Sequence, residues 1–363
     1  MAVYVFGSNA MSQLGMGEDF EDTHIPTILP FFNDKEIKKI SCGTLHTLCI
    51  TTDSKLWSWG CNDENALGRG GDETVPMEVV LNEKPVDITC GASISACITE
   101  NNNVWTWGTF RNFNGVYGYN KGTRLQSVPK KVSAGVSGFK FEEINSGANF
   151  VCLLSRNKSI WTFGSNDFNE LGRRTSERHK DSSLFPDQVF SGRVKKHNHK
   201  FRAVRAGLNH AIGINTDDEV YTWGSNIYGQ LGNGSTESTR LKCKVDIQNV
   251  QDVAGGEHHT LFLTREGDLY GCGRNEEGQL GIPSRENFTT PTRINIKDVV
   301  KVRSYENFSV CQVGNELYSF GVSYSGSHGF PEQIVAEPKK IPFEFSEIVD
   351  FSVGGSFTVV VTK

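Results

Sequence analysis

A short apolar strand that ends in a glycine, usually after an aromatic residue, recurs seven times along the chain. Two of its copies read LWSWGCNDENALG, from Leu56 to Gly68, and VYTWGSNIYGQLG, from Val220 to Gly232. The glycines at the same place in the seven copies are Gly7, Gly60, Gly108, Gly164, Gly224, Gly273 and Gly321. Successive glycines are 48 to 60 residues apart. A period of this length is typical of one supersecondary unit repeated along a solenoid or around a propeller.

A second repeated phrase runs in step with the first, with copies such as CGTLHTLCI from Cys42 and GGEHHTLFL from Gly255. In five repeats its glycine stands 17 residues before the glycine of the first phrase. The first phrase around Gly7 has no second phrase before it, and the second phrase around Gly354 has no first phrase after it. The two ends of the chain therefore hold the two halves of one repeat.

Each phrase predicts two short strands. Apolar residues alternate with period two in LWSW and VYTW, and the glycines mark turns. Two phrases supply four strands, which make one blade of a β-propeller. We predict an all-β fold, a single domain over residues 1–363 with seven four-stranded blades, the last joining Phe351 to Thr362 with Val3 to Phe6. An open solenoid is the alternative, but a solenoid normally carries atypical caps instead of matching half-repeats.

Composition and motifs argue against several functional classes. The chain has 363 residues, 37% of them hydrophobic, and a formal net charge of -5, which is typical of a soluble protein. It has no apolar run long enough to span a membrane and no signal peptide, so we expect neither membrane association nor secretion. Without a Walker loop, nucleophile elbow or HExxH motif, we expect no covalent catalysis, no cofactor and no small-molecule substrate. We expect a monomer.

The cysteines and tryptophans are predicted to belong to the scaffold. The nine cysteines form no CxxC pair and no zinc-ligand spacing, so we expect no metal site. Cys49, Cys97 and Cys311 stand at one place in the second phrase and are predicted to be buried, with redox sensing as the alternative. All six tryptophans lie in the first phrase, where phenylalanine replaces them in other copies. This interchange indicates packing between blades; a light-absorbing tryptophan cluster is the alternative.

The third copy of the first phrase departs from the others. It reads WGTFRNFNGVYG, from Trp107 to Gly118, with TFRNFNGV in place of the usual turn. This stretch and SWGCNDENALGR, from Ser58 to Arg69, resemble the family of the regulator of chromosome condensation, and the resemblance covers essentially the whole chain. It implies a seven-bladed propeller that acts as a guanine-nucleotide exchange factor for the small GTPase Ran. It also implies that TFRNFNGV is the family's protruding β-wedge.

The wedge is the segment that we predict to act on the GTPase. An exchange factor binds the nucleotide-free GTPase more tightly than the loaded one, so by linkage it weakens nucleotide binding. We expect Arg111 to pair with a carboxylate or carbonyl of the partner, and Phe110 and Phe113 to be apolar anchors. A surface loop without function is the alternative. The wedge residues are Thr109, Phe110, Arg111, Asn112, Phe113, Asn114 and Gly115.

Other residues are assigned to the GTPase-binding face by the resemblance alone. They are Asn149, Arg173 and His258. The family has a functional aspartate at the place of Asn149, and for His258 a structural role is the alternative. Acidic or histidine residues of the family are replaced at Ala10, Ala92 and Phe357, and Lys121 stands near a family glutamate. Fewer acidic side chains predict a weaker attraction to basic patches on a partner.

The longest step between repeats holds a basic insertion at about residues 173–202. The resemblance implies that such a loop holds nucleosomes or histones, and its residue types suit phosphate or acidic surfaces. The lack of a basic N-terminal arm weakens this prediction, and a solvated loop is the alternative. His197 and His199 are poor zinc ligands because no further ligand is spaced to join them. The candidate chromatin-binding residues are Arg193, Lys195 and Lys196.

Taken together, the residues and the resemblance predict a nuclear exchange factor for a Ran-like GTPase. The alternative function is a propeller adaptor that binds protein or chromatin without exchanging nucleotide, because many unrelated proteins use the same fold. Outside the nucleus, the cytoplasm is the expected compartment.

Overall fold

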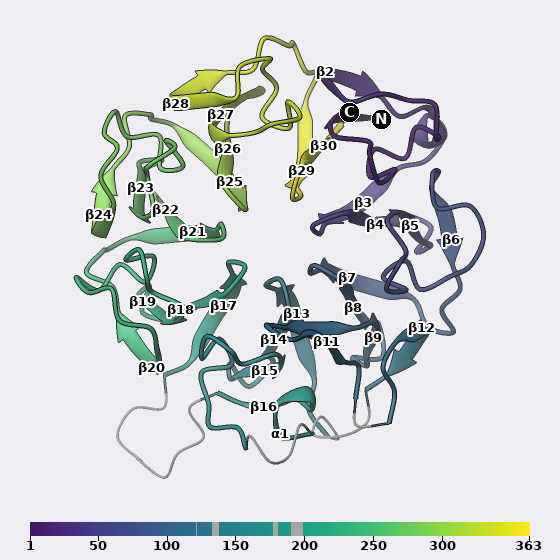
Figure 1. Cartoon of the computed structure of the whole chain (residues 1–363), viewed down its shortest axis with the longest axis horizontal. Helices are drawn as coiled ribbons and strands as arrows, with labels where there is room; N and C mark the ends of the chain where they lie inside the picture. Colours follow the sequence, from purple (N-terminus) through teal and green to yellow (C-terminus); the bar gives the residue numbers. More distant parts are fainter. Residues whose placement is uncertain (121, 133–137, 177–180, 190–198) are drawn as a thin grey trace.

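Seven four-stranded antiparallel sheets form a ring around a central axis in the computed structural model (Figure 1). The structure describes residues 1–120, 122–132, 138–176, 181–189 and 199–363. Each sheet is a blade whose first strand lies nearest the axis and whose fourth strand lies at the rim. The predicted seven-bladed propeller is therefore confirmed.

Three blades come from the first half of the chain. Blade 1 consists of β3 (Ile37–Cys42), β4 (His46–Thr51), β5 (Leu56–Gly60) and β6 (Met77–Val79). Blade 2 consists of β7 (Pro85–Cys90), β8 (Ile94–Thr99), β9 (Val104–Gly108) and β12 (Gln126–Lys131). Blade 3 consists of β13 (Phe141–Ser146), β14 (Phe150–Ser155), β15 (Ile160–Gly164) and β16 (Asp187–Gln188). Among the described residues there are also two short helices, η1 (Pro30–Phe32) and α1 (Asp181–Leu184).

Three further blades follow in the same order. Blade 4 consists of β17 (Phe201–Ala206), β18 (His210–Asn215), β19 (Val220–Gly224) and β20 (Thr239–Lys244). Blade 5 consists of β21 (Val250–Gly255), β22 (His259–Thr264), β23 (Leu269–Gly273) and β24 (Phe288–Arg293). Blade 6 consists of β25 (Val299–Tyr305), β26 (Phe308–Val313), β27 (Glu316–Val322) and β28 (Ile334–Lys340).

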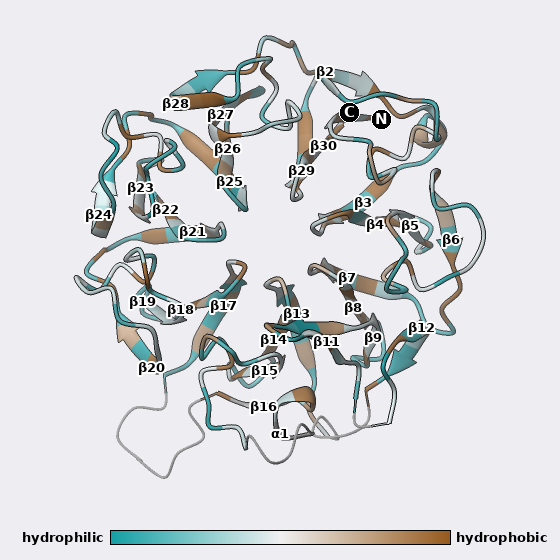
Figure 2. Cartoon of the chain, in the orientation of Figure 1, coloured by the Kyte–Doolittle hydropathy of each residue, from teal (hydrophilic) through white to brown (hydrophobic). Residues whose placement is uncertain are grey.

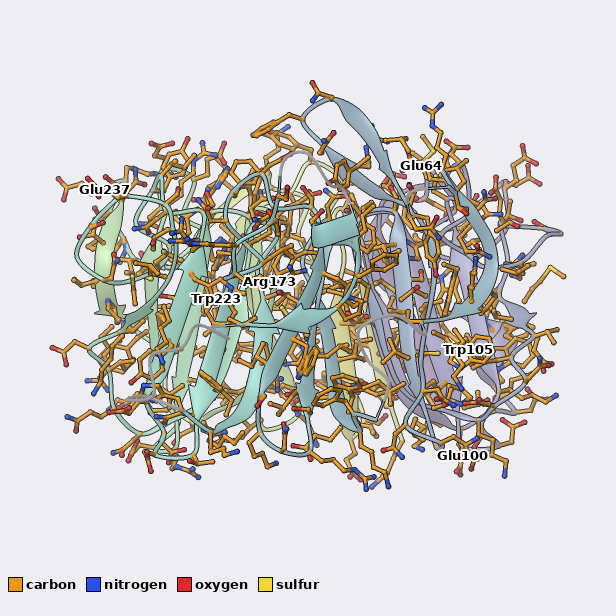
Figure 3. The ribbon with its side chains drawn as sticks, turned by 90° about the horizontal axis from the view of Figure 1, so that it is seen from below. Glu64, Glu100, Trp105, Arg173, Trp223 and Glu237 are labelled. Atoms are coloured by element: carbon orange, nitrogen blue, oxygen red, sulfur yellow. The ribbon has the colours of Figure 1, made fainter. Side chains whose placement is uncertain are left out.

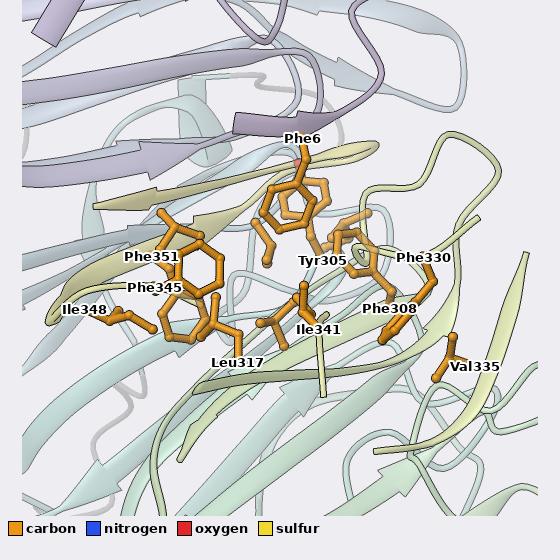
Figure 4. Packing of buried hydrophobic residues seen from close by; sticks show 14 of the residues in the cluster. Phe6, Tyr305, Phe308, Leu317, Phe330, Val335, Ile341, Phe345, Ile348 and Phe351 are labelled. Carbon is orange, nitrogen blue, oxygen red and sulfur yellow. The ribbon is translucent and has the colours of Figure 1, made fainter. Parts of the chain in front are cut away.

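Blade 7 closes the ring by joining the two ends of the chain. It consists of β29 (Ile348–Val353), β30 (Phe357–Thr362), β1 (Ala2–Gly7) and β2 (Thr23–Ile28). Strands β1 and β30 pair over their whole length, from Ala2 opposite Thr362 to Gly7 opposite Phe357. Phe6 packs in a cluster with side chains of blades 6 and 7 (Figure 4). This pairing confirms the predicted closure and ties down both ends of the chain.

Burial follows the place of each strand in its blade. The second strand of six blades is buried at every residue, whereas every residue of the fourth strands β20 and β24 is partly or fully exposed. These second strands, such as HTLCIT and FTVVVT, have apolar residues side by side in their middle, and the histidine and threonines at their ends are buried as well. Figure 2 shows hydrophobic stretches along the strands and mostly hydrophilic connections. The core of the propeller therefore lies between neighbouring blades.

The tryptophans and cysteines take part in this packing. Trp59, Trp107 and Trp223 are fully buried, and each indole N–H donates to a carbonyl of the preceding repeat, over 2.8 to 3.0 Å. Cys49, Cys97 and Cys311 are also fully buried. Burial raises the pKa of Cys311 to about 12. These residues are scaffold, as predicted, because a redox-sensing thiol needs exposure and a low pKa.

The backbone conformation explains why glycine recurs at the same place in the first phrase. Gly108 has a φ of +93°, and a Cβ on it would lie 2.1 Å from the carbonyl oxygen of Ser93. Only glycine tolerates both conditions. The second-phrase position is less strict, because Tyr305 replaces glycine there and places its hydroxyl 2.7 Å from Thr44 Oγ1 in blade 1.

Ion pairs join neighbouring blades around the axis. They include Lys39 with Asp87, Glu143 with Arg205, Arg205 with Asp252, Arg303 with Asp252, and Lys301 with Asp350. The first strands enclose an axial cavity of about 180 Å³. Within the described ranges, no helix is long and apolar enough to cross a membrane.

Candidate functional site

The predicted wedge is a separate hairpin that rises from one face of the ring. It consists of β10 (Phe110–Asn112) and β11 (Gly115–Gly118), inserted between β9 and β12 of blade 2. The side view in Figure 3 shows it standing above the upper face, with Glu64 beside it. Arg111 lies opposite Val116, and Asn112 lies opposite Gly115. The break in the repeat is therefore an ordered hairpin.

The turn of the hairpin follows from its residues. Asn112 Oδ1 accepts the backbone N–H of Asn114 at 3.0 Å, an Asx turn. Gly115 has a φ of +97°, which favours glycine. Phe113 at the tip is 74% exposed. The hairpin thus presents an aromatic ring to solvent at its turn.

Two wedge residues point inward. Phe110 is 1% exposed, and its ring packs edge-on against that of Phe163, with centroids 5.9 Å apart. Thr109 is fully buried and donates its hydroxyl to the carbonyl of Arg124 at 2.8 Å. The prediction that Phe110 is an apolar anchor for a partner is therefore wrong, because the ring belongs to the core at the root of the hairpin.

Arg111 is half-exposed and already has an acidic neighbour. Its guanidinium forms an ion pair with Glu64, which lies in the turn of blade 1 and is 17% exposed. Glu64 Oε2 is buried and has no hydrogen-bond partner among the described residues. A partner that takes Arg111 must therefore compete with Glu64.

Blade 3 supports the opposite side of the hairpin. Asn149 Oδ1 accepts the backbone N–H of Arg111 at 2.9 Å, and Asp167 Oδ2 accepts that of Phe113 at 2.9 Å. The rings of Phe113 and Phe168 pack edge-on with centroids 4.9 Å apart. A small pocket of about 190 Å³ lies between the hairpin and blade 3. The wedge therefore rests on two neighbouring blades.

Glu170 lies in this pocket wall and replaces a glutamine found in other repeats. Gln13, Gln230 and Gln279 each accept a backbone N–H two residues earlier, and Glu170 does the same with Phe168 at 2.7 Å. Burial raises the pKa of Glu170 to about 7. This carboxyl is thus far less acidic than one in water.

Arg173 is not on this face. It is 7% exposed, and its guanidinium donates to the backbone carbonyls of Thr162 and Phe185, at 3.1 and 3.0 Å from Nη2. Figure 3 shows it at mid-height in the propeller wall. Arg69 binds backbone carbonyls in the same way in blade 1. The expected GTPase contact is wrong for Arg173, because its donors are used inside the blade.

His258 does lie in a loop at the wedge face, within the second phrase of blade 5. Its ring packs against Tyr228 with centroids 4.8 Å apart, and its Nε2 is 3.4 Å from a carboxylate oxygen of Glu257. The side chain is 18% exposed, and burial lowers its pKa. The ring is therefore partly accessible, and its role as a partner contact stays a prediction.

Two acidic residues near the axis were not among the residues that the sequence predicted for this face. Glu257 and Glu306 occupy the loops of blades 5 and 6, where the Glu257 N–H donates to the Glu306 carbonyl at 2.9 Å. Burial, and then the charge of Glu257, raises the pKa of Glu306 to about 7. The resemblance to the family did not point to them, although they hold the place in the second phrase that Ala92 holds in blade 2. They supply acidic groups at this face.

The positions at which this chain differs from the family differ in their burial and location. Phe357 is fully buried between blades, so it cannot contact a partner. Ala10 is exposed, and Ala92 lies near the axis, where its N–H donates to the Ala148 carbonyl at 2.7 Å. Lys121 lies outside the described residues, as do the basic candidates Arg193, Lys195 and Lys196. Among the described residues, no three His, Cys, Asp or Glu side chains are grouped to hold a metal ion.

Comparison with known proteins places these features in one family. The family model described as RCC1-like domain matches residues 2–360. The human regulator of chromosome condensation is 29% identical in an alignment 248 residues long, which covers 65% of this chain and 58% of that protein. The guanine nucleotide exchange factor SRM1 of Saccharomyces cerevisiae is 27% identical in an alignment 268 residues long, which covers 63% of this chain and 54% of that protein.

The fold agrees with a solved relative. The crystal structure of Prp20p from Saccharomyces cerevisiae, described with its binding properties to Gsp1p and histones, has a TM-score of 0.91 and 26% identity. The match covers 99% of this chain and 90% of that one. The sequence alignments with the human and yeast relatives above cover less than two thirds of the length of each relative.

Proposed function

Because the chain belongs to the RCC1-like domain family, we propose that it promotes GDP/GTP exchange on a Ran-like small GTPase through the hairpin β10–β11. The observation that carries this proposal is the hairpin itself. It interrupts an otherwise regular repeat, stands above one face of the ring and exposes Phe113 at its tip. A rigid projection of this kind suits a protein that displaces a ligand from its partner and performs no covalent chemistry.

The mechanism is differential binding. When the wedge contacts the nucleotide-free GTPase more tightly than the loaded one, the affinity for nucleotide falls by the same factor. A difference of about 4 kcal/mol corresponds to a roughly thousandfold loss of nucleotide affinity. Phe113 supplies exposed apolar area for this contact, and Arg111 supplies a cation once it leaves Glu64. Asn112 and Asn114 shape the tip that carries them.

The surrounding face supplies a second, electrostatic contribution. Glu257 lies near the axis and attracts basic residues of a partner, which raises the rate of encounter more than the affinity. Glu306 adds less to this attraction, because its raised pKa of about 7 leaves it partly protonated near neutral pH. His258 lies beside Glu257 and forms part of the same surface.

Release of fluorescent GDP from a Ran-like GTPase tests the proposal. The chain accelerates release, and Phe113→Ala and Arg111→Ala reduce that acceleration without lowering thermal stability. Val80→Ala is the matched control, because Val80 is 80% exposed but lies beyond the rim strand β6. No acceleration by the wild-type chain would leave the propeller as an adaptor without exchange activity.

We also propose that the chain acts in the nucleus as a monomer and binds histones or the nucleosome, as a second partner, through the basic insertion. The support is the residue chemistry of Arg193, Lys195 and Lys196 together with the histone binding named for Prp20p. Charge reversal at these three residues weakens nucleosome binding and leaves GDP release unchanged. Equal nucleosome binding after reversal removes the insertion from this contact.

A further inference from the structure

The outer edge of the wedge is held by side chains instead of a strand. The N–H of Arg111, in β10, donates to Asn149 of blade 3, and the N–H of Phe113, in the turn that follows β10, donates to Asp167 of the same blade. An isolated two-stranded hairpin is at best marginally stable in water. These two acceptors give its free edge the partners that a third strand would supply.

Further contacts come from both sides. Phe168 of blade 3 packs against the ring of Phe113, and Glu64 of blade 1 forms an ion pair with Arg111. Glu64 and Asn149 belong to blades on opposite sides of the blade that carries the hairpin. We call Glu64, Asn149, Asp167 and Phe168 the wedge clamp. It spans three consecutive blades, so the pose of the hairpin is set by the ring.

From this geometry we propose that Asn149 is a positioning residue, which holds the wedge in its active pose by accepting the Arg111 N–H. This inference rests on the proposed exchange function. The resemblance to the family suggested instead that the side chain at this position contacts the GTPase. In the structure its amide oxygen faces the wedge backbone at 2.9 Å.

A held wedge is better suited to exchange than a mobile one. A segment that must be ordered on binding costs conformational entropy, and pre-organisation removes this cost. A loosened wedge must be ordered when it displaces the nucleotide, after the two proteins have met. The entropy cost of this ordering therefore slows the displacement step. Loss of the clamp therefore lowers kcat, whereas loss of a direct contact in the encounter complex raises KM.

The experiment compares three variants of the full chain. Asn149→Ala removes the acceptor, and Asn149→Asp keeps an oxygen that can accept the same N–H. Asn307→Ala is the matched control: Asn307 holds the same place in the second phrase of blade 6, across the ring, and its buried Oδ1 has no hydrogen-bond partner among the described residues. The rate of hydrogen exchange at the Arg111 amide shows whether its N–H is still hydrogen-bonded to the clamp. Steady-state measurements of GDP release give kcat and KM.

In Asn149→Ala we expect the Arg111 amide to exchange faster and kcat to fall about 2- to 10-fold, the worth of one hydrogen bond, with little change in KM. Asn149→Asp restores both values, and Asn307→Ala matches the wild type. Unchanged protection of the Arg111 amide in Asn149→Ala overturns the clamp, and a raised KM at constant kcat overturns the positioning role. The amide measurement needs no GTPase, so it decides the clamp even if the wild-type chain fails to release nucleotide.

Discussion

Replacing His210 by phenylalanine should make the propeller less sensitive to acid. His210 is fully buried between blades, with Nε2 2.7 Å from Thr260 Oγ1. Burial lowers its pKa to about 3. The ring is therefore neutral when folded and takes up a proton when the chain unfolds below its usual pKa of about 6.5.

The sign and size of the effect follow from proton linkage. The unfolded state binds more protons than the folded state between the two pKa values, so the contribution of His210 to stability falls as pH decreases below about 6.5. At pH 5 this loss is about 2 kcal/mol for one histidine, at 1.36 kcal/mol per pKa unit. His46 and His259 act in the same direction, because burial lowers their pKa values to about 4 and about 3.

Two carboxyls oppose these histidines, so the pH dependence of the wild type alone is not informative. The pKa values of Glu170 and Glu306 are raised to about 7. Each takes up its proton in the folded state first, so each adds stability as pH falls from about 7 toward its unfolded pKa near 4.5. The informative quantity is therefore the loss of unfolding free energy between pH 7.5 and pH 5, compared between the wild type and His210→Phe.

The repeat itself supplies the substitution. Phe150 occupies the place of His210 in blade 3 and is fully buried there. Thr260 keeps a partner after the change, because its hydroxyl donates to the Gln230 carbonyl at 2.7 Å. Urea unfolding at pH 7.5 and pH 5 measures the free energy of each chain. We expect the variant to lose about 2 kcal/mol less than the wild type between these values; equal losses would refute the argument.

Three further predictions concern the scaffold and the wedge. Gly108→Ala should lower the free energy of unfolding by more than about 1 kcal/mol, because its positive φ and a nearby carbonyl oxygen leave no place for a Cβ; thermal unfolding measures this. A thiol reagent should modify only Cys61 and Cys243 in the native chain, since the other cysteines are buried, and labelling followed by mass spectrometry shows which sites react. Phe110→Ala should cost about 3 to 5 kcal/mol of stability, whereas Phe113→Ala should slow GDP release with little loss of stability; the reverse pattern contradicts the burial of the two rings.

The architecture could be predicted because the same two phrases recur seven times along the sequence. The period gives the number of blades, and the unmatched half-repeats at Gly7 and Gly354 give the closure. The position of the wedge could also be predicted, because TFRNFNGV is the one turn that breaks the pattern. These features are periodic, so they do not depend on the orientation of any single side chain.

Individual side chains of the site were harder to predict. Phe110 and Phe113 are both aromatic residues of one short hairpin, but the ring at its root is buried in the core and the ring at its turn is exposed. Arg173 could have been recognised as scaffold, because Arg69 stands at the same place after LG in another repeat. Interchange between repeats had already identified the tryptophans by the same reasoning. The clamp by Asn149 depends on the distance between two blades, which no periodic pattern contains.

The central claim is tested most directly by the release of fluorescent GDP from a Ran-like GTPase in the presence of the full chain and excess unlabelled nucleotide. We predict that the wild-type chain accelerates release and that Phe113→Ala, matched against Val80→Ala, loses most of this acceleration at unchanged stability. A chain that binds the GTPase and leaves the release rate at its intrinsic value would contradict the claim.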